Sequence, residues 1–158
     1  PSSRASLQIG AVRLTERHVH RDPPPPEALD AVRAAARAAL GGLPAAARTL
    51  GAGARLVGVA GTVTTLSAVA QALTPYDGAR VHGATLSRED VEALLARLAA
   101  LPVAARAALP GMEPKRADVI VAGCAIVLEA MLATGFDRLT VSDRGVRWGL
   151  LEDDGAGA

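Results

Sequence analysis

Hydrophobic and polar positions follow two different periods along this chain, and their alternation predicts an α/β fold. Short runs of apolar and β-branched residues at 55–60 and 138–143 predict buried strands. Residues 6–19 alternate with period two, which predicts one strand with a glycine interruption or a tight hairpin. Apolar residues spaced three and four apart predict helices with one buried face at 27–40, 62–73, 87–100 and 116–134.

Capping and helix-breaking residues mark the ends of most of these segments. The run DPPPP at 22–26 ends the first strand, and Pro26 suits the first turn of the helix that follows. Ser87 is the expected N-cap of the third helix, and Gly135 ends the fourth. Shorter helices are expected at 44–50, after Pro102 and at 145–152, and loops at 74–83 and 109–114.

The composition narrows the class of protein. A chain of 158 residues suits one domain or two small lobes. Cys124 is the single cysteine, so the sequence offers no disulfide framework, which fits a reducing cytoplasm. We expect no nucleic-acid partner, because the formal charge is +1 and the basic residues are scattered. We also expect no membrane partner, because no apolar run reaches the roughly 20 residues that span a bilayer.

The stretch GVAGT, residues 58–62, links a predicted strand to a predicted helix. Gly58 and Gly61 remove side chains where the backbone turns or approaches another group closely. With Thr62 as cap, the helix would present N–H groups and the positive end of its dipole to an anion. The same residues also suit a plain strand–helix connection. The spacing matches neither a Walker loop nor a dinucleotide fingerprint.

Two further sets of residues are candidates for binding. Arg116 follows a proline-rich loop and precedes a helix, so it could bind an anion through two parallel hydrogen bonds. Alternatively, it could form a local ion pair with Asp118. His18 and His20 would share one face of the predicted first strand. They could form half a metal site, or they could belong to a solvated strand face, since no third ligand is apparent.

Taken in order, several motifs resemble the C-terminal half of the exopolyphosphatase / guanosine-pentaphosphate phosphatase (Ppx/GppA) family. They are IGAVRLTER (9–17), DPP (22–24), LVGVAGTVTTLSA (56–68), YD…VHG (76–83), RADVIVAG (116–123) and VSDRGVRWGLL (141–151). This family has the actin-like, sugar-kinase-like ATPase fold, with two ribonuclease-H-like lobes around a cleft. The resemblance therefore implies that residues 1–152 form an α/β ribonuclease-H-like second lobe, incomplete at its N-terminus, followed by a disordered tail at 153–158.

The resemblance also implies a function. The family hydrolyses terminal phosphates of inorganic polyphosphate or guanosine pentaphosphate, usually with Mg²⁺, in the cytoplasm. Gly58, Gly61, Thr62 and Arg116 are then expected to bind phosphate. The catalytic residues and the magnesium ligands are expected in a first lobe outside this chain, so the chain alone would be inactive.

The expected partners follow from the same comparison. The family's second lobe begins with a hairpin whose strands would lie between the strand at 6–14 and the strand at 55–60. We therefore expect a gap in the middle of the sheet, filled by the missing N-terminal lobe or by another copy in a homodimer. Three alternatives remain open: a non-catalytic module that binds phosphate chains or nucleotides, a dimerisation lobe, and a sugar or acetate kinase of the same superfamily.

Overall fold

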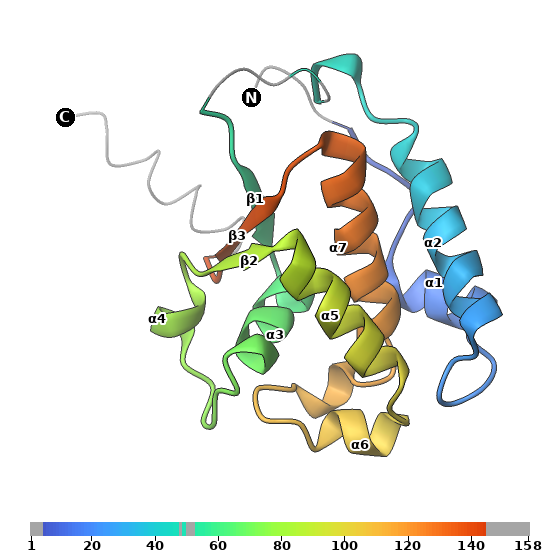
Figure 1. The fold of residues 1–158 in the computed structure, drawn as a ribbon, viewed down its shortest axis with the longest axis vertical. Coiled ribbons are helices and arrows are strands. Elements are labelled where there is room, and N and C mark those ends of the chain that lie inside the picture. The colour runs from blue at the N-terminus through green and yellow to red at the C-terminus, as the bar shows by residue number, and fades with distance from the viewer. Residues whose placement is uncertain (1–4, 48, 50–52, 145–158) are drawn as a thin grey trace.

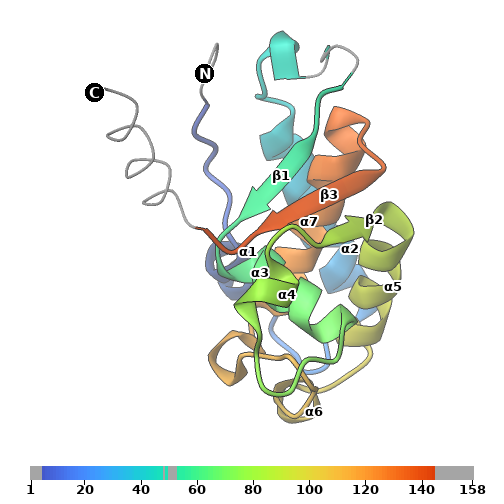
Figure 2. The same cartoon turned by 90° about the vertical axis from the view of Figure 1, so that its left-hand side faces the viewer.

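A small mixed sheet is covered on one face by helices. The computed structural model describes residues 5–47, 49 and 53–144 (Figure 1). Strand β1 (Leu56–Val59) pairs in parallel with β3 (Arg138–Ser142), which pairs antiparallel with β2 (Thr85–Ser87). The order is thus β1-β3-β2. Figure 2 shows this sheet lying in front of α7 and α2.

The longest helices match the apolar pattern of the sequence. The helices of the described part of the chain are α1 (Ala11–His18), α2 (Pro26–Leu40), α3 (Gly61–Ala70), α4 (Gly78–Val81), α5 (Arg88–Ala99), α6 (Val103–Ala107) and α7 (Ile120–Thr134), with 3₁₀ turns at Ala45–Ala47 and Pro114–Arg116. Helix α5 begins with the predicted cap, because Ser87 and Asp90 exchange side-chain and backbone hydrogen bonds. Helix α7 ends, as predicted, at a left-handed Gly135.

Helix α7 is apolar on all sides and forms the centre of the core. It contacts α1, α2, α3 and α5, and it runs between α2 and the sheet in Figure 1. A helix without a polar face is stable only when every side is covered. The buried faces of α3 and α5, and Leu139 and Val141 of β3, complete this core.

The predicted strand at 6–19 is wrong. Residues Ala11–His18 form helix α1, whose buried Leu14 faces the core, while Val12 on the opposite side is 56% exposed. The apolar residues of this segment also fit one face of a helix, and packing of that face against α7 stabilises the helix over the strand. Without that strand the predicted gap in mid-sheet does not arise, and β1 is an edge strand among the described residues.

Other elements of the structure also differ from the predicted ones. The predicted loop at 74–83 contains α4, β2 was not anticipated, and the helix expected from residue 116 begins at Ile120 after the 3₁₀ turn. Of the helix expected at 44–50, the described residues form only a 3₁₀ turn. The helix expected at 145–152 and the tail at 153–158 lie outside the described residues. In the part of the chain that is described, no helix is both long and apolar enough to cross a membrane.

Arg106 ties three separate segments together. Its side chain is buried at 2% exposure and donates to the carbonyl oxygens of Leu101 and Ala117 at 2.8 and 2.7 Å. Its Nη2 also donates to Asp22 Oδ1 at 2.8 Å, and Asp22 Oδ2 accepts from the first backbone N–H of α6, at Val103. Asp22 therefore joins the α1–α2 loop to α6, and Arg106 joins both to the segment before α7.

A buried ion cluster joins α2 to α7. Glu129 of α7 has a side chain only 1% exposed and accepts from Arg33 Nε at 2.7 Å and Arg37 Nε at 3.1 Å. The hydrogen bond and charge of Glu129 raise the pKa of Arg37. The two arginines thus compensate a carboxylate that α7 carries into the core.

Removing both arginines tests this compensation. The variant Arg33→Ala/Arg37→Ala leaves the Glu129 carboxylate buried and unpaired, which lowers the free energy of unfolding by about 3 kcal/mol. Adding Glu129→Met recovers most of that loss, because an apolar side chain of similar size needs no partner there. Urea denaturation followed by circular dichroism measures all three proteins. If the triple variant is no more stable than the double variant, the loss has another origin.

Candidate functional site

The chain turns sharply where β1 passes into α3. Strand β1 ends at Val59 and α3 begins at Gly61, so a single residue, Ala60, makes the turn. Ala60 has φ 73° and ψ 178°, a backbone region that is populated almost only by glycine and costs a side-chain-bearing residue about 1–3 kcal/mol. The strained turn places the first turn of α3 at the carboxyl end of β1.

The N-terminus of α3 is arranged to receive a negative charge. The first N–H groups of a helix have no acceptor within it, and they carry the positive end of the helix dipole. No side chain caps α3, and no acidic residue lies in its first turn. The hydroxyl of Thr64 donates to backbone carbonyl oxygens of Ala60 and Gly61, so it leaves these N–H groups open.

Arg116 lies directly over this helix terminus. Its guanidinium occupies the space that a Cβ on Gly61 would fill, so only glycine permits the approach. Arg116 Nε donates to Glu113 Oε2, and the side chain remains 38% exposed. A guanidinium and a helix N-terminus repel each other unless an anion lies between them. Their proximity therefore favours an anion site, with the Glu113 carboxylate as the present counter-charge.

These groups surround a cleft of about 370 Å³. At its rim, Tyr76 donates from its hydroxyl to Asp143 Oδ1 at 2.8 Å. Burial, followed by the hydrogen bond and charge of Asp143, raises the pKa of Tyr76 to about 12, so the phenol is protonated at neutral pH. The cleft is lined by Ala60, Gly61, Thr64, Thr65, Tyr76, Glu113, Arg116 and Asp143.

Two of the expected phosphate-binding residues lie together in the cleft, and two lie outside it. Gly61 and Arg116 are adjacent there. Gly58 serves the packing of β1, because a Cβ there would lie 2.8 Å from Val63 Cγ1. Thr62 is not the helix cap, because α3 begins one residue earlier. Its methyl group would lie 2.8 Å from a Cβ on Gly123, so Thr62 contacts α7 instead.

Besides Arg116, the cleft has three titratable residues, and none of these three was singled out from the sequence. Tyr76 and Asp143 stand in motifs that were noticed, YD and VSDRG, but 67 positions separate them. Glu113 could have been found from its spacing to Arg116, since it lies three residues earlier and forms the ion pair that had been assigned to Asp118. Spacing along the sequence could thus have indicated Glu113, but it could not indicate the contact between Tyr76 and Asp143.

The cleft does not fit a magnesium site. Its two carboxylates are each engaged, Glu113 by Arg116 and Asp143 by Tyr76. Nowhere in the described ranges do three His, Cys, Asp or Glu side chains gather closely enough to hold a metal ion.

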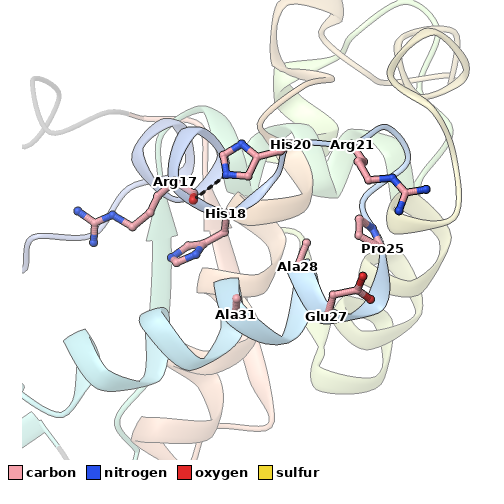
Figure 3. A pocket seen from close by; sticks show the side chains of 8 residues that line it. All are labelled: Arg17, His18, His20, Arg21, Pro25, Glu27, Ala28 and Ala31. Carbon is pink, nitrogen blue, oxygen red and sulfur yellow. Dashed lines mark hydrogen bonds between the residues drawn. The ribbon is translucent and has the colours of Figure 1, made fainter.

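A second, basic pocket of about 380 Å³ lies between the end of α1 and the start of α2. It is lined by Arg17, His18, His20, Arg21 and Glu27, with Pro25, Ala28 and Ala31. Figure 3 shows the side chains of Arg17 and Arg21 pointing apart. The predicted shared strand face of His18 and His20 is wrong, because His18 ends α1. His20 Nε2 lies 3.1 Å from the carbonyl oxygen of Arg17. The pocket lacks a converging set of ligands.

Fold and cleft together define an α/β protein in which a guanidinium lies against the N-terminus of a helix. The family model of the Ppx/GppA phosphatase family matches residues 1–155. The chain belongs to this family, and its fold is part of the actin-like ATPase fold of the family's known structures.

Individual relatives agree with this assignment. Exopolyphosphatase 2 of Mycobacterium tuberculosis is 43% identical over 152 residues, which cover 92% of this chain and 46% of that protein. The crystal structure of the Aquifex aeolicus family member superposes with a TM-score of 0.84 at 32% identity, covering 95% of this chain and 47% of that one. An exopolyphosphatase from Cytophaga hutchinsonii gives 0.77 at 27% identity, with coverages of 97% and 50%. The chain spans about half the length of these relatives.

The strain at Ala60 can be measured. We expect Ala60→Gly to raise the free energy of unfolding by about 1 kcal/mol, since the relief of strain exceeds the added entropy of the unfolded chain. Ala70→Gly, at the exposed end of α3, is the matched control and should lower it by about 0.5–1 kcal/mol. Urea denaturation measures both. A loss of stability in Ala60→Gly equal to that of the control would mean that the turn is unstrained.

Proposed function

We propose that this chain forms one wall of the substrate cleft in a phosphatase that hydrolyses terminal phosphoanhydride bonds of inorganic polyphosphate or guanosine pentaphosphate. The observation that carries the proposal is the Arg116 guanidinium held against the N-terminus of α3. Helix N-termini and arginine are the groups that proteins commonly use to hold phosphate. Membership of the Ppx/GppA family and the likeness to exopolyphosphatases support the reaction class.

In this proposal the backbone N–H groups at 61–63 and the Arg116 side chain hold the phosphate chain. Binding requires Arg116 to exchange its hydrogen bond to Glu113 for one to a phosphate oxygen. Gly61 permits the close approach of both groups, while Gly58 and Thr62 fix β1 and α3 in place through packing. Phosphoryl transfer depends mainly on such positioning and on neutralisation of charge, with water attacking the terminal phosphorus.

The remaining parts of the reaction would come from outside this chain. We place the catalytic carboxylate and the Mg²⁺ ligands in the half of the relatives that this chain does not span. Magnesium, when bound there, would neutralise charge on the phosphates. The 158-residue chain alone would then bind a phosphate chain without turning it over.

The edge of β1 is the proposed contact with the half of the relatives that this chain does not span. Val57 and Val59 of this strand are 51% and 43% exposed, and its outer edge has no strand partner among the described residues. Exposed edge strands readily pair with other strands. A strand of the N-terminal lobe, or of a second copy in a homodimer, would pair there. A cytoplasmic location fits the family and the single buried thiol, Cys124.

Titration separates this function from its alternatives. Binding of tripolyphosphate and guanosine pentaphosphate without turnover by the full-length protein would favour a non-catalytic binding module. Failure to bind either ligand, with tight self-association in light scattering, would favour a dimerisation lobe.

Substitution of Arg116 tests the site directly. In the full-length protein we expect Arg116→Ala to raise KM for polyphosphate about tenfold or more, because a charge-assisted hydrogen bond contributes about 1.5–3 kcal/mol. Lys115→Ala is the matched control, since Lys115 is exposed, adjacent in sequence and absent from the lining of the cleft. Steady-state release of phosphate measures both variants. Unchanged kinetics in Arg116→Ala would remove this residue from the site.

A further inference from the structure

Glu113 and Arg116 are held side by side at the wall of the cleft. Both residues line it, and Arg116 Nε donates to Glu113 Oε2. Glu113 precedes the 3₁₀ turn Pro114–Arg116, and the backbone N–H of Arg116 donates to the carbonyl oxygen of Glu113 at 2.9 Å. Residues three apart in such a turn lie on the same side of it. The backbone alone therefore keeps the carboxylate within reach of the guanidinium.

The segment that carries this pair is anchored on both sides. Before the pair, Gly111 has φ 82°, and a Cβ on it would overlap the backbone of Ala68 in α3, so only glycine fits there. After the pair, the carbonyl oxygen of Ala117 accepts from Arg106 at 2.7 Å. A carboxylate held in place by its own backbone acts at a high effective concentration. It therefore competes strongly with a dissolved anion for Arg116.

The charges that line the cleft do not favour an anion while Glu113 remains there. Glu113 and Asp143 each contribute a carboxylate, whereas the positive groups are Arg116 and the N-terminus of α3, with about half a charge. Besides burial and Asp143, the charge of Glu113 contributes to the raised pKa of Tyr76, so this charge acts across the cleft. A phosphate chain gains a positive site only when the carboxylate of Glu113 moves away.

We propose that Glu113 is an internal competitor of the phosphate, whose carboxylate takes the place of a phosphate oxygen at Arg116 and is displaced when the substrate binds. The inference rests on the proposed function, because it takes Arg116 as a phosphate ligand. The geometry of a guanidinium matches carboxylate and phosphate alike. The side chain of Glu113 is 51% exposed, so it can turn into solvent without becoming a buried, unpaired charge. Glu113 thus lowers the affinity of the cleft for phosphate.

Removal of the charge at position 113 tests this competition. Glu113→Gln keeps the shape of the exposed side chain but cannot form an ion pair with Arg116. We expect the variant to bind a phosphate chain about fivefold more tightly, which is the factor that an exposed ion pair contributes. The measurement is calorimetric titration of the full-length protein with a tripolyphosphate analogue whose bridging oxygens are replaced by NH groups, so that hydrolysis does not interfere.

Two further comparisons separate the competition from general repulsion between charges. Asp118→Asn is the matched control, because Asp118 is exposed, lies two residues after Arg116 and is absent from the lining of the cleft. It removes the same charge and should change Kd by less than about twofold, since solvent and salt screen exposed charges. In an Arg116→Ala background Glu113 has nothing to compete for, so Glu113→Gln should no longer tighten binding.

Each failure has a distinct meaning. If Glu113→Gln binds the analogue no more tightly than the wild-type protein, Glu113 only positions Arg116 and the competition is overturned. An equal gain in Asp118→Asn, or an undiminished gain in the Arg116→Ala background, would overturn it in favour of general repulsion. These results leave the phosphate site intact. If the analogue binds neither the wild-type protein nor Glu113→Gln, or if Arg116→Ala changes no affinity, the proposed function itself is wrong.

Discussion

The whole structure depends on the burial of α7 among its neighbours. This helix has no polar face, so α1, α2, α3 and α5 must cover it. The contact with α3 is close, because a Cβ on Gly123 would lie 2.8 Å from the methyl group of Thr62. That contact sets where α3 begins relative to the segment before α7, which carries Arg116. The geometry of the cleft is therefore a product of core packing.

The sequence predicts the long elements and misses those that depend on tertiary contacts. Helices α2, α5 and α7 have enough apolar residues at helical spacing to be recognised, and β1 and β3 enough β-branched ones. Helix α1 has only eight residues, and its Val12 faces outward, so its local pattern resembled a strand. Strand β2 exists because β3 offers it a partner about 50 residues away, which no local pattern reports.

The residues of the candidate site show the same difference between those with a local sequence signal and those that depend on tertiary contacts. Gly61 and Arg116 could be proposed because glycines at a strand–helix turn and an arginine before a helix are local signals. Tyr76 and Asp143 meet only in the folded chain, so their hydrogen bond had no signal in either motif. The expected cap role of Thr62 is wrong because Ala60, which has no capping side chain, is the N-cap of α3. A sequence pattern does not report the backbone strain at Ala60.

The buried Arg106 links a distant loop to the cleft. It holds the carbonyl of Ala117, the residue after Arg116, and it depends on Asp22 in the loop between α1 and α2. The direction in which Arg116 leaves the backbone is thus controlled partly by a loop that does not line the cleft. Sequence changes near Asp22 would therefore shift Arg116 from a distance, so the shape of the cleft responds to a loop whose residues lie outside it.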